Sequence, residues 1–326
     1  MKTILVIGGA GYIGSHMVKM LLANGYYVVT LDNLSTGYRD AIVGGDFVFG
    51  DTMESKGLDR LLTAYQFDGV MHFASFIQVG ESMQIPGKYY QNNVAATLNL
   101  IDAMVSHNIK ALIFSSSAAI FGEPQYIPLD EQHPKQPINP YGLSKWMIEQ
   151  ILADYDRAYG LKFSCLRYFN AAGADPEGEL GERHDPETHL IPLVLQTASG
   201  QRDTIRVFGQ DYDTPDGTCI RDYIHINDLC QAHLLALEQL LKGAESMTYN
   251  LGNGAGFSVK EVIDIAKEVT GKVISVSMEE RRTGDPARLV ADSTQAQSYL
   301  GWQPQYTDLA TIIDHAWQWE RKMTNC

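Results

Sequence analysis

The sequence predicts an α/β fold, in which a doubly wound parallel sheet is followed by a smaller C-terminal substrate domain. Three observations predict it. Apolar runs alternate with helix-periodic segments through the first half, a glycine-rich turn follows the first run, and the alternation stops after Asn170, where a stretch rich in Gly, Pro and acid begins. We expect one domain at residues 1–170 and a second, mainly substrate-binding domain at 171–326, with a segment near 220–251 that rejoins the first.

The helices and strands of the first half are predicted from the hydrophobic pattern and from the Gly and Asn residues that end each segment. Short apolar runs predict strands, and periodic segments that end at Gly or Asn predict helices. The predicted strands are Thr3–Ile7, Tyr26–Asp32, Asp46–Gly50, Gly69–Ala74, Ala111–Ser116 and Lys162–Arg167. The predicted helices are Ser15–Ala23, Ser55–Tyr65, Tyr89–His107 and Tyr141–Tyr159. This alternation is typical of right-handed βαβ units with both faces of the sheet covered.

Helix signals resume in the second half. Residues 258–261 read S-x-x-E, a capping box that predicts a helix up to Val269, just before a glycine. Asp292 and Asp308 are each predicted to cap a further helix. Residues 248–251 are expected to return to the first sheet as a strand.

Composition excludes several classes of protein. The net charge of −14 argues against a nucleic-acid partner, which needs a basic surface, and no apolar run approaches the roughly 18 residues of a membrane span. The four cysteines, of which Cys326 is the last, form no C-x-x-C pair, and the first apolar run is too short for a signal peptide. We therefore expect a cytoplasmic protein. His16, His72 and His225 lie in apolar elements without ligand spacing, so no metal site is expected.

A dinucleotide-binding motif lies between the first predicted strand and helix. Residues 8–14 read G-G-A-G-Y-I-G, and Gly8, Gly11 and Gly14 allow a tight turn whose backbone approaches a pyrophosphate. Asp32 ends the second strand, about 20 residues later, where a carboxylate accepts hydrogen bonds from ribose hydroxyls. It would repel a 2′-phosphate, and no Arg follows it, so this Rossmann motif favours NAD over NADP. The alternative is a purely structural turn.

A second motif places Tyr141 and Lys145 four residues apart, on one face of a predicted helix. A nearby ammonium lowers the pKa of a phenol by roughly 1–3 units, and an oxidised nicotinamide would add to this, so Tyr141 is a candidate general base. Ser117 ends a serine run at the carboxyl end of strand five, where open α/β sheets bind ligands. The alternative is an ordinary surface pair.

Together these motifs resemble the extended short-chain dehydrogenase/reductase family and, within it, the UDP-glucose 4-epimerases, over essentially the whole chain. Further stretches that carry the resemblance are His72–Ala74, Val79–Ser82, Asn92–Val94, Leu166–Asn170, Arg221–His225, Tyr249–Gly252 and R-R-x-G-D at 281–285, with Gly284. The resemblance implies an isomerase that interconverts UDP-glucose and UDP-galactose through a 4-keto sugar, with bound NAD as transient hydride acceptor. It also implies a homodimer formed through residues 92–107 and 141–159.

The resemblance implies roles residue by residue, with Tyr141 the base, Lys145 its electrostatic partner and Ser117 the hydroxyl that guides the sugar O4. The residues implied to bind NAD are Gly8, Gly11, Tyr12, Ile13, Gly14, Asp32, Asn33, Asp51, Thr52, Phe73, Ala74, Asn92, Ser117, Tyr141, Lys145 and Phe169. Those implied to bind the UDP-hexose are Ser117, Tyr141, Asn170, His189, Arg221, Arg282, Asp285 and Leu289.

Several alternatives remain open on the sequence. Arg221 could form a salt bridge with the neighbouring Asp222, and Arg282 could be a solvated arginine. Alanines follow Ser117 where dehydratases of the family carry carboxylates, which argues against dehydration. Leu289 is of intermediate size, and His189 replaces an amide of some members, so an epimerase of UDP-N-acetylglucosamine or UDP-glucuronate is an alternative. A non-catalytic NAD-sensing module is another.

Overall fold

A parallel sheet forms the centre of the molecule. Within residues 1–282 and 285–324, which the computed structural model describes, seven strands pair in the order β11-β6-β5-β4-β1-β2-β3, all parallel. They are β1 (Thr3–Ile7), β2 (Tyr27–Asp32), β3 (Asp46–Phe49), β4 (Gly69–His72), β5 (Ala111–Ser117), β6 (Lys162–Tyr168) and β11 (Met247–Leu251). This order is the doubly wound one, so the predicted fold class is confirmed. Gly284 and Cys326 lie outside the described residues.

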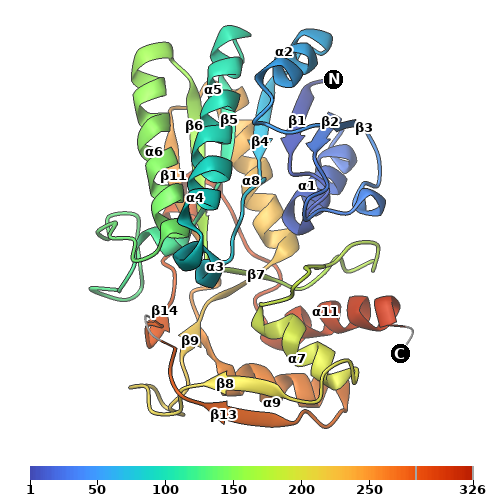
Figure 1. Ribbon diagram of the computed structural model, residues 1–326, viewed down its shortest axis with the longest axis vertical. Helices are drawn as coiled ribbons and strands as arrows, with labels where there is room; N and C mark the ends of the chain where they lie inside the picture. Colours follow the sequence, from blue (N-terminus) through green and yellow to red (C-terminus); the bar gives the residue numbers. More distant parts are fainter. Residues whose placement is uncertain (283–284, 325–326) are drawn as a thin grey trace.

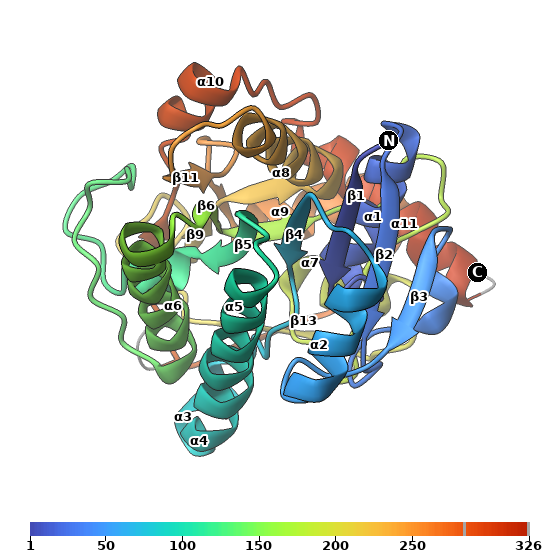
Figure 2. The ribbon, with the colours of Figure 1, turned by 90° about the horizontal axis from the view of Figure 1, so that it is seen from above.

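Helices cover both faces of the sheet (Figure 2). On one face lie α2 (Ser55–Ala64), α5 (Ala96–Ser106) and α6 (Pro140–Tyr159), which share a buried core with the strands. On the other lie α1 (Tyr12–Ala23), α8 (Ile226–Leu241) and α10 (Thr294–Leu300). Both faces are therefore removed from water, as near-continuous apolar strands require.

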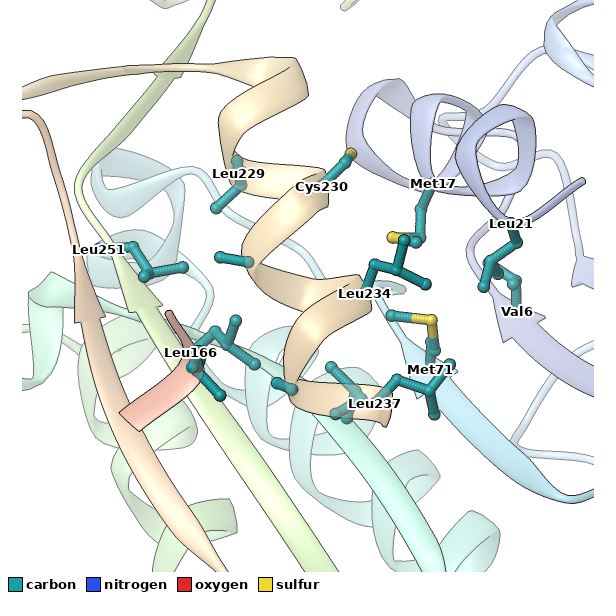
Figure 3. Packing of buried hydrophobic residues seen from close by; sticks show 14 of the residues in the cluster. Val6, Met17, Leu21, Met71, Leu166, Leu229, Cys230, Leu234, Leu237 and Leu251 are labelled. Atoms are coloured by element: carbon teal, nitrogen blue, oxygen red, sulfur yellow. The ribbon is translucent and has the colours of Figure 1, made fainter. Parts of the chain in front are cut away.

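Helix α8 explains why the chain returns to the sheet. Its buried residues Leu234 and Leu237 lie beside Met17 of α1 and Met71 of β4 in one apolar cluster (Figure 3). Burying each such side chain stabilises the fold by about 1.5–3 kcal/mol. Helix α8 docked in this way delivers β11 to the free edge of β6, so the prediction that residues 248–251 rejoin the sheet is confirmed.

A second body lies at the other end of the long axis (Figure 1). It contains α7 (Leu190–Ala198), α9 (Val259–Thr270), α11 (Leu309–Thr324), and the paired strands β8 (Ile205–Phe208) and β13 (Val276–Glu279). Its core is separate, with Val194, Ile263, Ile312 and Trp317 buried together. Short strands join the two bodies: β7 (Asn170–Ala172), β9 (Ile220–Arg221), β10 (Tyr223–His225), β12 (Phe257–Ser258) and β14 (Arg288–Leu289).

The helix boundaries correct some predictions. Helix α1 begins at Tyr12, three residues before the predicted start, because the glycine turn leads straight into it. The helix predicted from Tyr89 to His107 is three elements: α4 (Pro86–Tyr89), a π-helical turn at residues 90–95, and α5. A further helix, α3 (Val79–Gln84), precedes them.

The predicted caps of the later helices are mostly confirmed. The capping box at Ser258 and Glu261 is present in both directions, and Asp308 accepts a hydrogen bond from the amide of Thr311 in α11. Asp292 is not the cap of α10: the N-cap is Ser293, and Asp292 accepts from the amide of Thr294 in a local turn. None of the helices described is long and apolar enough to cross a bilayer.

Candidate active site

The glycine turn between β1 and α1 is shaped for a close approach of backbone. Gly8 has φ +78°, and a Cβ there would lie 2.6 Å from the amide nitrogen of Ala74. A Cβ on Gly14 would lie 2.1 Å from the carbonyl oxygen of Gly8. Gly11 is the N-cap of α1 and no acidic residue occupies the first turn, so the amides of Tyr12 and Ile13 at this positive helix end face no side-chain cap. The turn fits a dinucleotide pyrophosphate.

Asp32, at the end of β2, holds the turn next to it. One carboxylate oxygen accepts from the amide of Ala10 at 2.9 Å and the other from the amide of Leu34 at 2.8 Å. Asp32 is only 8% exposed. Each oxygen keeps a lone pair, so the carboxylate is fixed by backbone and can still accept from ribose hydroxyls.

The other residues expected around the cofactor gather at the same edge of the sheet. Asn33 donates to Asp51 at 2.8 Å, beside the buried Thr52. After β4, Phe73 donates its amide to Ile7 and packs its ring against His233, and Ala74 touches the glycine turn.

Asn92 is placed by an element that the sequence did not reveal, and Phe169 by the end of the predicted strand β6. Asn92 lies in the π-helical turn, where its amide donates to Asn93 at 3.0 Å. Such turns are frequent at functional sites. Phe169, just after β6, packs against a small buried cluster that contains Phe121 and Leu129. Their contacts with a cofactor stay predictions.

The predicted catalytic residues Ser117, Tyr141 and Lys145, the candidate catalytic trio, come together at the end of β5. Asn139 caps α6 by accepting from the amide of Gly142 at 2.8 Å, and Pro140 occupies the first turn. This start places the buried phenol of Tyr141 in hydrogen-bond contact with the side chain of Ser117. One turn later, Lys145 donates to the carbonyl of Ser115 at 2.8 Å, with its nitrogen 6.0 Å from the centre of the Tyr141 ring.

Burial dominates the electrostatics of this pair. It raises the pKa of Tyr141 above its usual value, against the opposing hydrogen bond with Ser117. It also lowers the pKa of Lys145 to about 7, although Cys165 and Glu149 act to raise it. Burial thus outweighs the other influences on the pKa of Tyr141 in the chain alone, because removing water disfavours the charged form. That Lys145 and an oxidised nicotinamide together lower this pKa stays a prediction. A phenolate here needs additional positive charge.

Sequence reasoning missed a buried ion pair beneath the trio. Glu149 lies two turns after Tyr141 on α6 and pairs with Arg167 of β6, with Nη2 and Oε2 2.6 Å apart. Ser116 donates to the same carboxylate at 2.5 Å. The helical spacing of Tyr141, Lys145 and Glu149 could have indicated the shared face, but the partner in β6 could not be read from it.

A cavity of about 280 Å³ lies in the second body, against the joining strands β7, β9 and β10, and five of the predicted substrate residues line it. These are Asn170, His189, Arg221, Arg282 and Asp285. Leu289 is not in its lining; it pairs with Arg221 across β14 and β9 and packs near Phe121. Sequence reasoning missed Phe208, Arg206 and Tyr223, which also line the cavity.

The arginines of the cavity are positioned by partners distant in the chain. Arg221 pairs with Asp285 at 3.0 Å and donates to the carbonyl of Pro286. The alternative pairing with Asp222 is wrong, because the fully buried Asp222 accepts instead from the amides of residues 253, 254 and 291. Arg282 stacks on Phe208, 4.2 Å from the ring centre, with 63% of its side chain exposed. Arg221 and Arg282 thus face one cavity, which Arg202 and Arg206 also line.

The remaining candidates have structural partners. Asn170 donates its side-chain amide to the carbonyl of Asp222 at 2.7 Å. Burial lowers the pKa of His16 to about 4 and the pKa values of His72 and His225 to about 3, so all three are neutral at pH 7. For His189 burial acts in the same direction, but the carboxylates of Glu182 and Glu187 raise its pKa to about 10.

Known proteins are similar to this chain in sequence and in fold. The model of the NAD dependent epimerase/dehydratase family matches residues 4–252. A UDP-glucose 4-epimerase of Halalkalibacterium halodurans is 52% identical over 98% of this chain and 96% of its own. A crystal structure of a UDP-glucose 4-epimerase superposes with a TM-score of 0.97 at 51% identity, covering 99% of both chains. The Brucella ovis UDP-glucose 4-epimerase in complex with NAD gives 0.95 at 48% identity, over 97% of this chain and 98% of that one. The chain therefore belongs to the NAD dependent epimerase/dehydratase family.

Proposed function

We propose that this chain interconverts UDP-glucose and UDP-galactose through a 4-keto sugar, with a tightly held NAD. One observation carries the proposal: Ser117, Tyr141 and Lys145 stand at the sheet edge that bears the glycine turn. The arginine-lined cavity lies beyond that edge. The names of the relatives support the same activity. The three candidate catalytic residues alone would be compatible with many dehydrogenases. Together with an arginine-lined cavity, they favour a nucleotide sugar as the substrate.

Each of the three candidate catalytic residues has a separate role in the proposed reaction. NAD, when bound, supplies a nicotinamide that takes hydride from the sugar C4 and returns it. Tyr141 removes the proton of the 4-hydroxyl and gives it back, and Ser117 orients that oxygen. The Lys145 ammonium, held on the carbonyl of Ser115, supplies part of the positive charge that the buried phenolate needs.

Inversion at C4 requires unequal binding of the two halves of the substrate. We assign the diphosphate to Arg221 and Arg282, because guanidinium–phosphate contacts are strong and bidentate. These contacts act at close range, whereas the repulsion from a net charge of −14 is screened beyond about 8 Å in the cell. The keto sugar is then free to turn over while the nucleotide stays anchored, so hydride returns to its other face.

Product analysis tests the proposal. The purified chain is incubated with UDP-galactose without added NAD, and products are separated by anion-exchange chromatography, with parallel arms containing UDP-N-acetylglucosamine and UDP-glucuronate. We expect UDP-glucose to form and Tyr141→Phe to lose about 100-fold or more in turnover while it retains NAD. Tyr155→Phe, on the surface of the same helix, is the matched control. Absence of UDP-glucose even after NAD is supplied would refute the assignment.

We also propose that the chain works as a cytoplasmic homodimer in galactose metabolism. The proposed contact is formed by residues 92–107 and 141–159, because Leu143 and Met147 of α6 are 37% and 38% exposed there. Sedimentation velocity tests it: a mass of two chains is expected, falling to one in Leu143→Glu/Met147→Glu. The free, buried Cys165 and Cys219 support a reducing compartment.

A further inference from the structure

Four side chains outside the catalytic trio converge just before α7. Glu182, His184, Glu187 and His189 occupy an E-x-H-x-x-E-x-H pattern, and one nitrogen or oxygen of each lies within 4.8 Å of all the others. The Nδ1 of His184 is 3.1 Å from Glu182 and 3.6 Å from Glu187. The Nδ1 of His189 is 3.0 Å from Glu182 and 2.9 Å from Glu187. The two imidazoles therefore face the same two carboxylates.

This geometry is that of ligands around a common centre. Four ligands at about 2.0–2.2 Å from a tetrahedral Zn²⁺ are separated from one another by about 3.3–3.6 Å. The four observed nitrogen–oxygen distances range from 2.9 to 3.6 Å. The buried Nδ1 of His184 makes no hydrogen bond, although a carboxylate oxygen is 3.1 Å away. At His184, nitrogen and oxygen are thus close without forming a hydrogen bond, which leaves this nitrogen available to a third atom, whereas Nδ1 of His189 forms a hydrogen bond with Oε1 of Glu187 at 2.9 Å.

We propose that Glu182, His184, Glu187 and His189 bind one divalent transition-metal ion, with Zn²⁺ the best match to two imidazoles and two carboxylates. Zinc accepts both imidazole and carboxylate ligands, and four protein ligands fill a tetrahedral site without water, which indicates a structural rather than a catalytic ion. The side chains of Glu182 and Glu187 are only 8% and 4% exposed, so their negative charge needs compensation within the fold.

The state that competes with metal binding is a set of ion pairs between the two histidines and the two glutamates. Burial acts to lower the pKa of both histidines, but the two carboxylates raise it to about 9 for His184 and about 10 for His189. Without a metal the cluster is therefore neutral overall, with two imidazolium rings. Zn²⁺ must displace both protons, and a direct binding measurement decides between the two states.

The position of the cluster indicates what the ion does. The segment 173–189 crosses the start of α1, where Tyr12 donates to the carbonyl of Gly173 at 2.7 Å and its ring meets the edge of His184. From the other side, Trp319 of α11 donates to the carbonyl of Glu182 at 3.1 Å. An ion bound by the cluster would therefore hold residues 173–189 in place against the glycine turn. This role is independent of the sugar on which the enzyme acts.

Metal binding is tested on the untagged full chain. The protein is stripped by dialysis against a chelator and titrated with ZnCl₂ in competition with a fluorescent chelator. We expect one equivalent per chain and an affinity at least about 100-fold weaker in Glu182→Gln/His184→Ala. The matched control is His107→Ala, since His107 also contacts a carboxylate, Asp59, but on the surface. No stoichiometric Zn²⁺, or equal affinity in variant and control, would overturn the site.

A second measurement needs only the wild-type chain, so it does not depend on how a variant folds. Hydrogen exchange of residues 173–189 is compared between stripped and Zn²⁺-loaded protein. The fastening role predicts exchange slower by about 10-fold or more in this segment, with little change in α2. Equal rates in the two forms would overturn it.

Discussion

Replacing Glu149 by glutamine removes one charge from beneath the catalytic trio and keeps the shape of the side chain. In the folded protein Glu149 and Arg167 are each 3% exposed, and Nε of Arg167 donates to Oε1 of Glu149 at 3.0 Å. The Nη1 of Arg167 already has no hydrogen-bond partner. The substitution therefore leaves a guanidinium in the core without its counter-ion.

The size of the effect follows from that burial. Breaking a buried ion pair by neutralising one partner costs about 3–5 kcal/mol. At about 2.1 cal/mol/K per residue, a chain of 326 residues unfolds with an entropy of about 0.7 kcal/mol/K. The expected fall in Tm is therefore about 4–7 °C for a cooperative transition.

Thermal unfolding followed by circular dichroism measures this fall. Glu268→Gln, on the exposed side of α9, is the matched control and should stay within about 1 °C of wild type. The double variant Glu149→Met/Arg167→Met should recover most of the loss, because it removes both charges. A Glu149→Gln protein as stable as the control would refute the reasoning. Turnover should fall as well, since Glu149 acts to raise the pKa of Lys145.

Three further predictions follow from the site and the core. Gly14→Ala should lose at least about nine-tenths of its bound NAD, measured as the nucleotide released on denaturation. The control Gly57→Ala should keep its NAD, because a Cβ at Gly57 meets no atom closer than 3.6 Å. Arg221→Met should raise KM for UDP-galactose roughly 10–100-fold with a smaller change in kcat, because it loses a charge-assisted contact; an unchanged KM would remove Arg221 from the site. The lowered pKa values of His16 (about 4) and His72 (about 3) mean that the unfolded chain, with histidine pKa 6.5, binds more protons as pH falls below 6.5. Stability present above pH 6.5 should thus be lost below it, by about 1 kcal/mol per histidine between about pH 6.5 and 5.5. Denaturant unfolding at these two pH values would show no loss from this pair if both rings were charged in the fold.

Local pattern was enough to predict the first half of the fold and the site motifs within it. The glycine turn, the position of Asp32 and the four-residue spacing of Tyr141 and Lys145 depend on strand ends and helix periodicity, which neighbouring residues determine. The same holds for the Ser258 capping box, a contact between residues three apart. These features are local, so the sequence carries them directly.

Tertiary structure decided the partners and the electrostatics. Arg221 pairs with Asp285, 64 positions away, rather than with its neighbour, because backbone amides of three distant residues already hold Asp222. Burial raises the pKa of Tyr141 in the chain alone, an effect that the four-residue spacing from Lys145 did not reveal. Desolvation and long-range pairing depend on which surfaces meet after folding, and no interval along the chain encodes either. The sequence by itself thus determined the positions of these groups in the helices and strands. Only the tertiary structure decided their partners and the direction in which each pKa is shifted.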